Sequence, residues 1–241
     1  MAGSRVLPQA LAQRARAFVA SGLVAVEARP ASTVVMVRDA AAGLEVYVHR
    51  RHRGMAFAGG MLAFPGGGVD PVDNSTVGAD AEAWAARLGA EPAAAWAFVR
   101  AALRETEEET GVVLQPEDLL PWAHWITPRF EERRFDTWFF LAGLTAGQQP
   151  QDVSGETEHV AWVRPGDALA AASRGESVML PPTQLVLEEL SAFDSVGAAL
   201  AAGPERTIEA IMPAWIDDGE VVRALLPDDP EYPGDDVEVR A

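Results

Sequence analysis

Apolar and polar positions early in the chain form two patterns typical of β-strands, a continuous apolar run and an alternation. Residues 31–38 contain the run Thr33 to Val37, rich in β-branched side chains, which predicts a buried strand. Residues 44–50 alternate and predict a second strand. The turn-like residues 39–43 join the two, so the pair is expected to form an antiparallel hairpin.

A helical pattern occupies residues 91–110. This segment is rich in alanine, a strong helix former, and Gly111 stands where a left-handed C-terminal cap is expected. Phe98 and Ala102 recur on one face and offer it to a core. Shorter helices are predicted at 8–21 and 81–88.

The second half of the chain alternates strand and helix patterns. Strands are predicted at 112–114, 135–142, 160–163, 207–211 and 219–226. Helices are predicted from residue 165 and at 184–192 and 196–202, with Asp167 and Thr183 as N-caps. The stretch 122–125 is rich in aromatic residues.

Three carboxylates gather on the long predicted helix. Glu105, Glu108 and Glu109 have the spacing i, i+3 and i+4, which places them on one face. Like charges so arranged repel each other unless a cation lies among them, and Mg²⁺ binds through few carboxylates together with substrate phosphates. On the helix alone, a solvated acidic face is the alternative.

A glycine-rich turn, Phe64-Pro65-Gly66-Gly67-Gly68, precedes this helix and lets backbone approach a ligand closely. Turn and helix together resemble the signature of the Nudix hydrolases, Gly-x5-Glu-x7-Arg-Glu-U-x-Glu-Glu-x-Gly-U, where U is bulky and apolar. The residues that match its second half are Arg104, Glu105, Glu108, Glu109, Gly111 and Val112.

The first half of the signature departs from the pattern. Trp96 stands where the signature has a glutamate, whereas the second half departs only at Thr106, which replaces its first apolar residue. Gly67 and Arg104 lie 37 positions apart, far more than the undivided signature allows. The chain thus resembles a branch of the family in which an insertion, here at about residues 70–90, splits the signature. Asp70 and Asp73 in this insertion are expected to be loop and cap residues, with a contribution to metal binding as the alternative.

The resemblance implies a fold and a chemistry. The expected fold is α/β, a Nudix fold with a mixed, curved β-sheet in an α/β/α sandwich. The expected reaction is hydrolysis of a diphosphate linkage with Mg²⁺ or Mn²⁺ held by the three glutamates and a backbone carbonyl near Gly66 or Gly67. Glu105 or Glu156 would accept the proton of the attacking water, and Arg104 would orient the glutamates.

The substrate is expected to be a small phosphorylated nucleotide derivative. The segment from Arg51 to Gly67 resembles the one that precedes the signature in coenzyme A diphosphatases, so coenzyme A or an acyl-coenzyme A is the first expectation. ADP-ribose or a nucleotide sugar is the second, and a non-catalytic nucleotide sensor is an alternative of another class. Several residues are candidates for substrate binding, because guanidinium groups fit phosphate oxygens: Arg51, Arg53, Arg129, Arg134 and Gly66. For the arginines, the alternative is a place in a solvated loop or a surface ion pair.

Composition narrows these expectations. The chain has 241 residues, no cysteine and a formal net charge of −17. Thiol chemistry is therefore excluded, and a surface for long nucleic acid is disfavoured. Neither a signal peptide nor an apolar membrane span is evident, so a cytoplasmic enzyme is expected.

Three segments are predicted along the chain. They are an N-terminal flank at 1–29, a Nudix domain at 30–203 that contains the insertion, and an acidic C-terminal extension at 204–241. The end of the extension, residues 228–241, is predicted to be an extended tail or the arm of a homodimer.

Overall fold

The computed structural model describes residues 5–7, 9–52, 54, 59–75, 78–144, 147–153, 155 and 157–232. The chain divides into two compact units. Unit 1 comprises Met1–Arg29, His124–Asp136 and Glu209–Ala241, and unit 2 comprises Pro30–Ala123 and Thr137–Ile208. Each unit has a hydrophobic core of its own.

The sheet of unit 2 is built around a hairpin. Strand β2 (Arg29–Ala40) pairs antiparallel with β3 (Gly43–Arg51) across a two-residue turn, with Val37 opposite Val46. This confirms the predicted hairpin. The remaining strands of the sheet are β4 (Leu62–Ala63), β5 (Gly66–Gly68), β6 (Leu120–Ile126), β7 (Phe135–Gly143) and β8 (Thr157–Val163).

The order of strands shows how the glycine turn enters the sheet. The main path runs β4-β3-β2-β7-β6, while β5 pairs with β2 and β8 pairs with β3. Both of these additional pairings are antiparallel. The glycines that follow Pro65 therefore form a short strand on the hairpin rather than a free turn.

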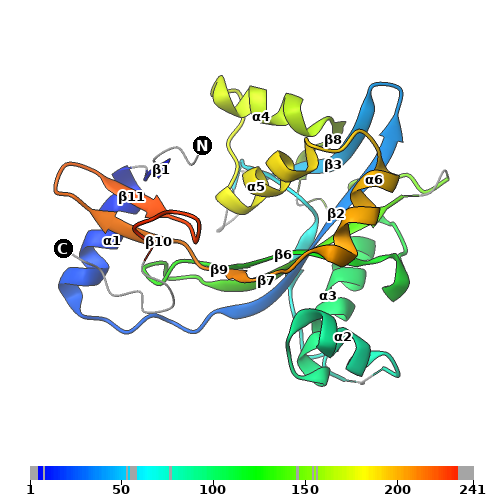
Figure 1. The fold of residues 1–241 in the computed structure, drawn as a ribbon, viewed down its shortest axis with the longest axis horizontal. Coiled ribbons are helices and arrows are strands. Elements are labelled where there is room, and N and C mark those ends of the chain that lie inside the picture. Colours follow the sequence, from blue (N-terminus) through cyan, green and yellow to red (C-terminus); the bar gives the residue numbers. More distant parts are fainter. Residues whose placement is uncertain are drawn as a thin grey trace. The chain divides into compact units, whose positions relative to one another are not determined.

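Helices cover both faces of this sheet. In Figure 1, α2 (Ala81–Leu88) and α3 (Pro92–Thr110) lie on one side, and α4 (Pro165–Ser173) and α5 (Pro181–Leu190) lie on the other. Helix α6 (Val196–Ala202) and the 3₁₀ turns η1 (Pro116–Asp118) and η2 (Gly203–Glu205) complete the unit. This arrangement confirms the predicted α/β fold.

The buried core of unit 2 joins α2 and α3 to the sheet. Met36 and Phe140 from the sheet meet Phe98 of α3, and Trp84 of α2 packs edge-on against Phe140. Trp84 belongs to the predicted insertion. Its burial shows that its indole packs the insertion onto the body of the domain.

Unit 1 combines chain segments that are distant in sequence. Helix α1 (Gln9–Ser21) accompanies a three-stranded sheet of β1 (Arg5–Val6), β11 (Val222–Leu225) and β10 (Ala214–Asp217). Trp215 lies at the centre of its core, with the rings of Phe18 and Phe130 edge-on to it. Strand β9 (Ala210–Ile211) pairs in parallel with His124 and Trp125 at the end of β6, which makes the larger sheet mixed.

Several predicted elements differ from the structure. Residues 112–114 form no strand, and Leu120–Ile126 forms one that the sequence pattern did not predict. The N-caps of α4 and α5 are Arg164 and Leu180, because each helix begins on a proline, which suits the first turn. Asp167 and Thr183 thus lie inside their helices, so both predicted caps are wrong.

Residues 233–241, which include the end of the predicted tail, lie outside the described residues. Among the described residues, no helix has the length and apolar character needed to cross a membrane.

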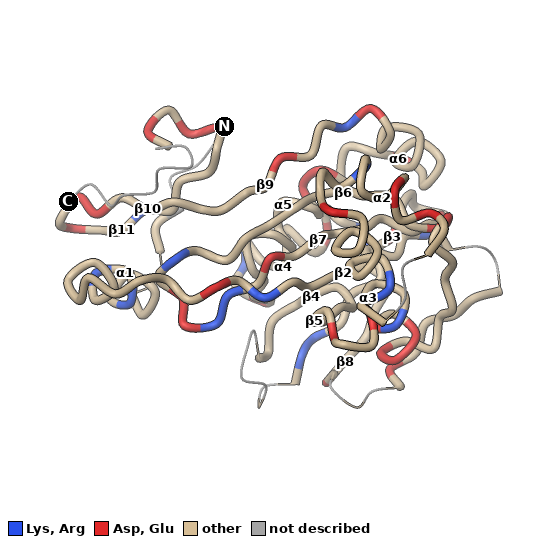
Figure 2. The backbone as a smooth tube through the Cα atoms, turned by 90° about the horizontal axis from the view of Figure 1, so that it is seen from below, with Lys and Arg blue, Asp and Glu red and all other residues tan. Residues whose placement is uncertain are grey.

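Figure 2 shows acidic and basic segments side by side around α3 and β5, which is where the predicted site lies.

Candidate active site

Helix α3 presents the three glutamates in graded exposure. It begins at Pro92 with Glu91 as N-cap and ends at Gly111, whose φ of 70° is the predicted left-handed cap. The Glu108 side chain is 58% exposed, that of Glu105 is 16% exposed, and Glu109 is 7% exposed. One edge of the helix face therefore meets solvent and the other is buried against the sheet.

The glycine strand β5 receives the two more buried carboxylates. The Gly66 N–H donates a hydrogen bond of 3.0 Å to Glu109 Oε2. A Cβ at Gly66 would overlap the β2 backbone at Ser32 and Thr33, and a Cβ at Gly67 would overlap the Glu105 carboxylate. The absence of a side chain at Gly67 thus allows the Glu105 carboxylate of α3 to lie close to the strand, and its absence at Gly66 allows β5 to pair closely with β2.

Replacing Gly67 with alanine tests this close approach. The added Cβ would displace the Glu105 carboxylate, whereas a Cβ at Gly68 would meet nothing nearer than the Pro30 carbonyl oxygen at 3.9 Å. Because a misplacement of about 1 Å can cost roughly 100-fold in rate, we expect Gly67→Ala to lose roughly that factor in kcat/KM. Steady-state kinetics of Gly67→Ala beside Gly68→Ala measure the difference, and equal activity in both variants would contradict it.

Arg104 connects the helix to the predicted insertion. Its guanidinium donates to both carboxylate oxygens of Asp73, at 3.2 and 2.9 Å, and to the Gly68 carbonyl at 2.9 Å. It also donates to Glu105 at 2.8 Å and to Glu108 at 3.0 Å. The bonds to Asp73, followed by Glu105, raise the pKa of Arg104, although burial opposes the shift. Arg104 thus acts as a fixed cation among acidic side chains.

Burial gives Glu105 a basicity above that of an ordinary glutamate. Desolvation raises its pKa, and the hydrogen bond and charge of Arg104 offset part of that rise. The carboxylate therefore holds a proton more readily than an exposed glutamate does. This property suits a group that accepts a proton during a reaction.

His49 on β3 is a site residue that sequence reasoning missed. It is 2% exposed, and its Nδ1 lies 3.9 Å from Glu109 Oε2. Burial, followed by the charge of Arg51, lowers the pKa of His49 to about 4, so the imidazole is neutral at pH 7. The sequence offered one indication of this position: His49 lies two residues after Tyr47 and so on the same face of the strand, and Tyr47 belongs to the core cluster beside α3.

Asp73 has a structural role beyond the loop contact that the sequence predicts. It is 1% exposed and accepts the Asp70 backbone N–H at 2.8 Å, which is the expected loop contact. Its carboxylate is also the partner of Arg104, 31 positions further along the chain. The sequence pattern gave no indication of this second contact.

The candidate substrate residues belong to different units of the chain. Arg51 ends β3 in unit 2, where its backbone pairs with Gly60 and Met61. Arg129 and Arg134 belong to unit 1, where Arg134 donates to the carbonyls of Thr127 at 3.0 Å and Val26 at 2.6 Å. Arg53 and the proposed proton acceptor Glu156 lie outside the described residues.

The carboxylate oxygens of α3 and the glycine backbone beside them are ligands of the type that a hard divalent cation prefers. Within the described residues, no three His, Asp or Glu side chains are already grouped as a metal cluster. Arg104 instead holds Glu105 and Glu108, and Gly66 holds Glu109. Mg²⁺ binds through one or two carboxylates plus substrate phosphates, so a set of carboxylate oxygens beside bare glycine backbone suits it.

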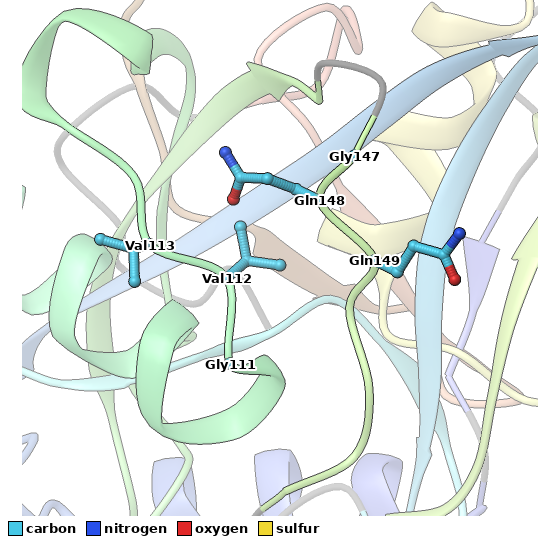
Figure 3. A pocket seen from close by; sticks show the side chains of 6 residues that line it. All are labelled: Gly111, Val112, Val113, Gly147, Gln148 and Gln149. Carbon is cyan, nitrogen blue, oxygen red and sulfur yellow. The ribbon is translucent and has the colours of Figure 1, made fainter.

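Two shallow pockets flank α3. One, of about 410 Å³, is lined by Gly111, Val112, Val113, Gly147, Gln148 and Gln149. In Figure 3 the Gln148 side chain extends toward the two valines and Gln149 points away from them. The other, of about 280 Å³, lies beside Asp73 and Arg104. Glu105 and Glu109 line neither pocket, so the carboxylates and the hollows are separate features of the surface.

Comparison with known proteins places this geometry in a family. A Nudix hydrolase structure from Alicyclobacillus acidocaldarius shares 27% identity, covering 73% of this chain and 96% of that one, with a TM-score of 0.60. An Ap4A hydrolase complex from C. elegans shares 20% identity, covering 68% of this chain and 96% of that one, with a TM-score of 0.44.

The NUDIX domain of Shewanella oneidensis NrtR, solved with ADP ribose, shares 14% identity, covering 76% of this chain and 96% of that one, with a TM-score of 0.48. No curated protein sequence matches the chain. The model of the NUDIX domain matches residues 28–182, which are more than half of the chain. The chain therefore belongs to the Nudix family and is a Nudix hydrolase.

Proposed function

We propose that this Nudix hydrolase uses Mg²⁺ or Mn²⁺ to cleave the diphosphate linkage of coenzyme A or an acyl-coenzyme A. The observation that carries the metal-dependent reaction is the meeting of α3 and β5. There the Glu105 and Glu109 carboxylates lie against the Gly66–Gly67 backbone, where no side chain intervenes. The choice of coenzyme A rests on the segment from Arg51 to Gly67, which resembles coenzyme A diphosphatases.

In the proposed reaction, the residues of α3 have two roles, metal binding and the orientation of the metal ligands. Glu105, Glu108 and Glu109, with the Gly67 carbonyl, would hold the cation. When bound, a divalent cation neutralises charge on the diphosphate and acts as a Lewis acid. Arg104 keeps Glu105 and Glu108 in place through charge-assisted hydrogen bonds of 2.8 and 3.0 Å.

Proton transfer requires a carboxylate near the attacking water. Glu105 is one candidate, because burial raises its pKa and so makes it a stronger base than an exposed glutamate. Glu156, which directly precedes β8 in the sequence, is the other. Arg51, Arg53, Arg129, Arg134 and Gly66 remain candidates for contacts with the substrate, since guanidinium groups match phosphate oxygens.

The proposal is tested by identifying products from a panel of diphosphates. The panel contains coenzyme A, acetyl-coenzyme A, ADP-ribose, NADH and dinucleoside polyphosphates, each with Mg²⁺ or Mn²⁺. Release of 3′,5′-ADP and 4′-phosphopantetheine is the expected result. If only ADP-ribose is cleaved, to AMP and ribose 5-phosphate, then ADP-ribose and not coenzyme A is the substrate. Metal binding with no turnover of any compound would favour a nucleotide sensor.

A further inference from the structure

The inward face of β3 carries polar side chains into the core beside α3. Tyr47 and His49 are two residues apart and each is 2% exposed. Tyr47 belongs to the core cluster that includes Phe98 and Ala102 of α3, so this face of the strand is turned toward the glutamate helix. Burying an imidazole costs free energy to the extent that its nitrogens lack hydrogen-bond partners.

The contacts of the two His49 nitrogens are unequal. Among the described residues, Nε2 is buried with no hydrogen-bond partner, whereas Nδ1 lies 3.9 Å from Glu109 Oε2. The same Oε2 accepts the Gly66 N–H at 3.0 Å. One buried carboxylate oxygen is therefore approached from two strands, by a backbone amide of β5 and an imidazole of β3.

We propose that His49 is a positioning residue of the active site, whose Nδ1–H, together with the Gly66 N–H, fixes the orientation of the Glu109 carboxylate. This inference rests on the proposed role of Glu109 as a metal ligand. The distance of 3.9 Å is longer than a hydrogen bond, and catalytic hydrogen bonds are often long in unliganded sites and tighten in the loaded one. Groups that orient a ligating carboxylate typically contribute 10–100-fold to metal affinity or activity.

The effect should be large because both partners are buried. Glu109 is 7% exposed, so water competes little for its oxygen, and a hydrogen bond in such surroundings is stronger than one at the surface. A carboxylate that lost His49 would be oriented by one group fewer and could shift about its hydrogen bond with the Gly66 N–H. The metal site would then be held less rigidly, although the core around it would remain packed.

Two substitutions separate the hydrogen bond from packing. The amide nitrogen of asparagine lies two bonds beyond Cβ, as Nδ1 of histidine does, so His49→Asn keeps a donor near the original position. His49→Leu keeps an apolar side chain and removes the donor. His159 on β8 is exposed, and His159→Leu serves as the matched control.

Mn²⁺ affinity, measured by titration with electron paramagnetic resonance detection of free Mn²⁺, is the first readout. We expect His49→Leu to lose about 10–100-fold in Mn²⁺ affinity, His49→Asn to lose less, and His159→Leu to match the wild-type enzyme. Unchanged affinity in His49→Leu would overturn the inference. So would equal losses in both His49 variants together with equal falls in their metal-free melting temperatures, since those falls would show packing alone.

A measurement on the wild-type enzyme is independent of how the variants fold. Nitrogen NMR of labelled histidine should show the Nδ1–H form of His49 and a change in its resonance when Mg²⁺ is added. An Nε2–H form would overturn the inference alone. Failure of the wild-type enzyme to bind Mn²⁺ would overturn the proposed function, and the two failures are therefore distinguishable.

Discussion

Glu109→Gln should leave a folded protein that has lost at least about 100-fold in kcat, because a metal site that loses one charged ligand loses part of a contribution of several kcal/mol. The amide oxygen of glutamine can still accept the Gly66 N–H, which now reaches Glu109 Oε2 at 3.0 Å. The local backbone contact should therefore survive while the charge is lost. The measurements are steady-state kinetics on the best substrate of the panel and the melting temperature without metal.

Glu107→Gln is the matched control for this experiment. Glu107 lies two residues away on α3 and is exposed, so the same chemical change should alter kcat by no more than about twofold. Full activity in Glu109→Gln would show that the buried carboxylate is not a metal ligand. A loss of equal size in Glu107→Gln would point instead to the overall charge of the helix.

Arg104→Met should lower the melting temperature by roughly 6–20 °C. Removing one partner of a buried ion pair costs about 3–5 kcal/mol, and 1 kcal/mol corresponds to about 2–4 °C in a protein of this size. Asp73 would be left 1% exposed without the cation that now donates two hydrogen bonds to it. The melting temperature is measured by calorimetry or circular dichroism.

Two further variants test whether Asp73 is the cause. Arg104→Met combined with Asp73→Asn removes the stranded charge and keeps an acceptor for the Asp70 N–H, so it should recover much of the lost stability. Arg174→Met breaks an ion pair in which both side chains are 57% exposed, and should leave the melting temperature unchanged. If the double variant is less stable than Arg104→Met, the Arg104–Asp73 pair does not explain the loss.

The parts of the fold that the sequence predicted well depend on local signals. Alanine content, a terminal glycine and regular spacing define α3 and place its glutamates on one face, and helices 81–88 and 196–202 have the predicted bounds. The β2–β3 hairpin follows from apolar runs on either side of a turn. Each of these signals acts within a few neighbouring residues.

The errors arise where tertiary packing overrides local preference. Val112 and Leu114 suggested a strand, but they are buried in the core, and no strand forms at 112–114 among the described residues. Strand β6 was missed because Pro121 lies near its start and its side chains, buried on both faces, do not alternate.

The candidate site shows the same division between local and distant information. His49 lies near Glu109, and Asp73 pairs with Arg104, although each pair is distant in the chain. No spacing rule within a single sequence reveals such contacts.

The contacts of Arg104 bear on how this domain tolerates changes in chain length. The two halves of the signature lie 37 positions apart, yet Arg104 joins them through the Gly68 carbonyl and Asp73. Doubling the length of a flexible loop costs only about 0.6 kcal/mol of closure entropy, far less than a lost buried ion pair. A change of chain length between the two halves of the signature should therefore cost the domain less than the loss of Asp73 would.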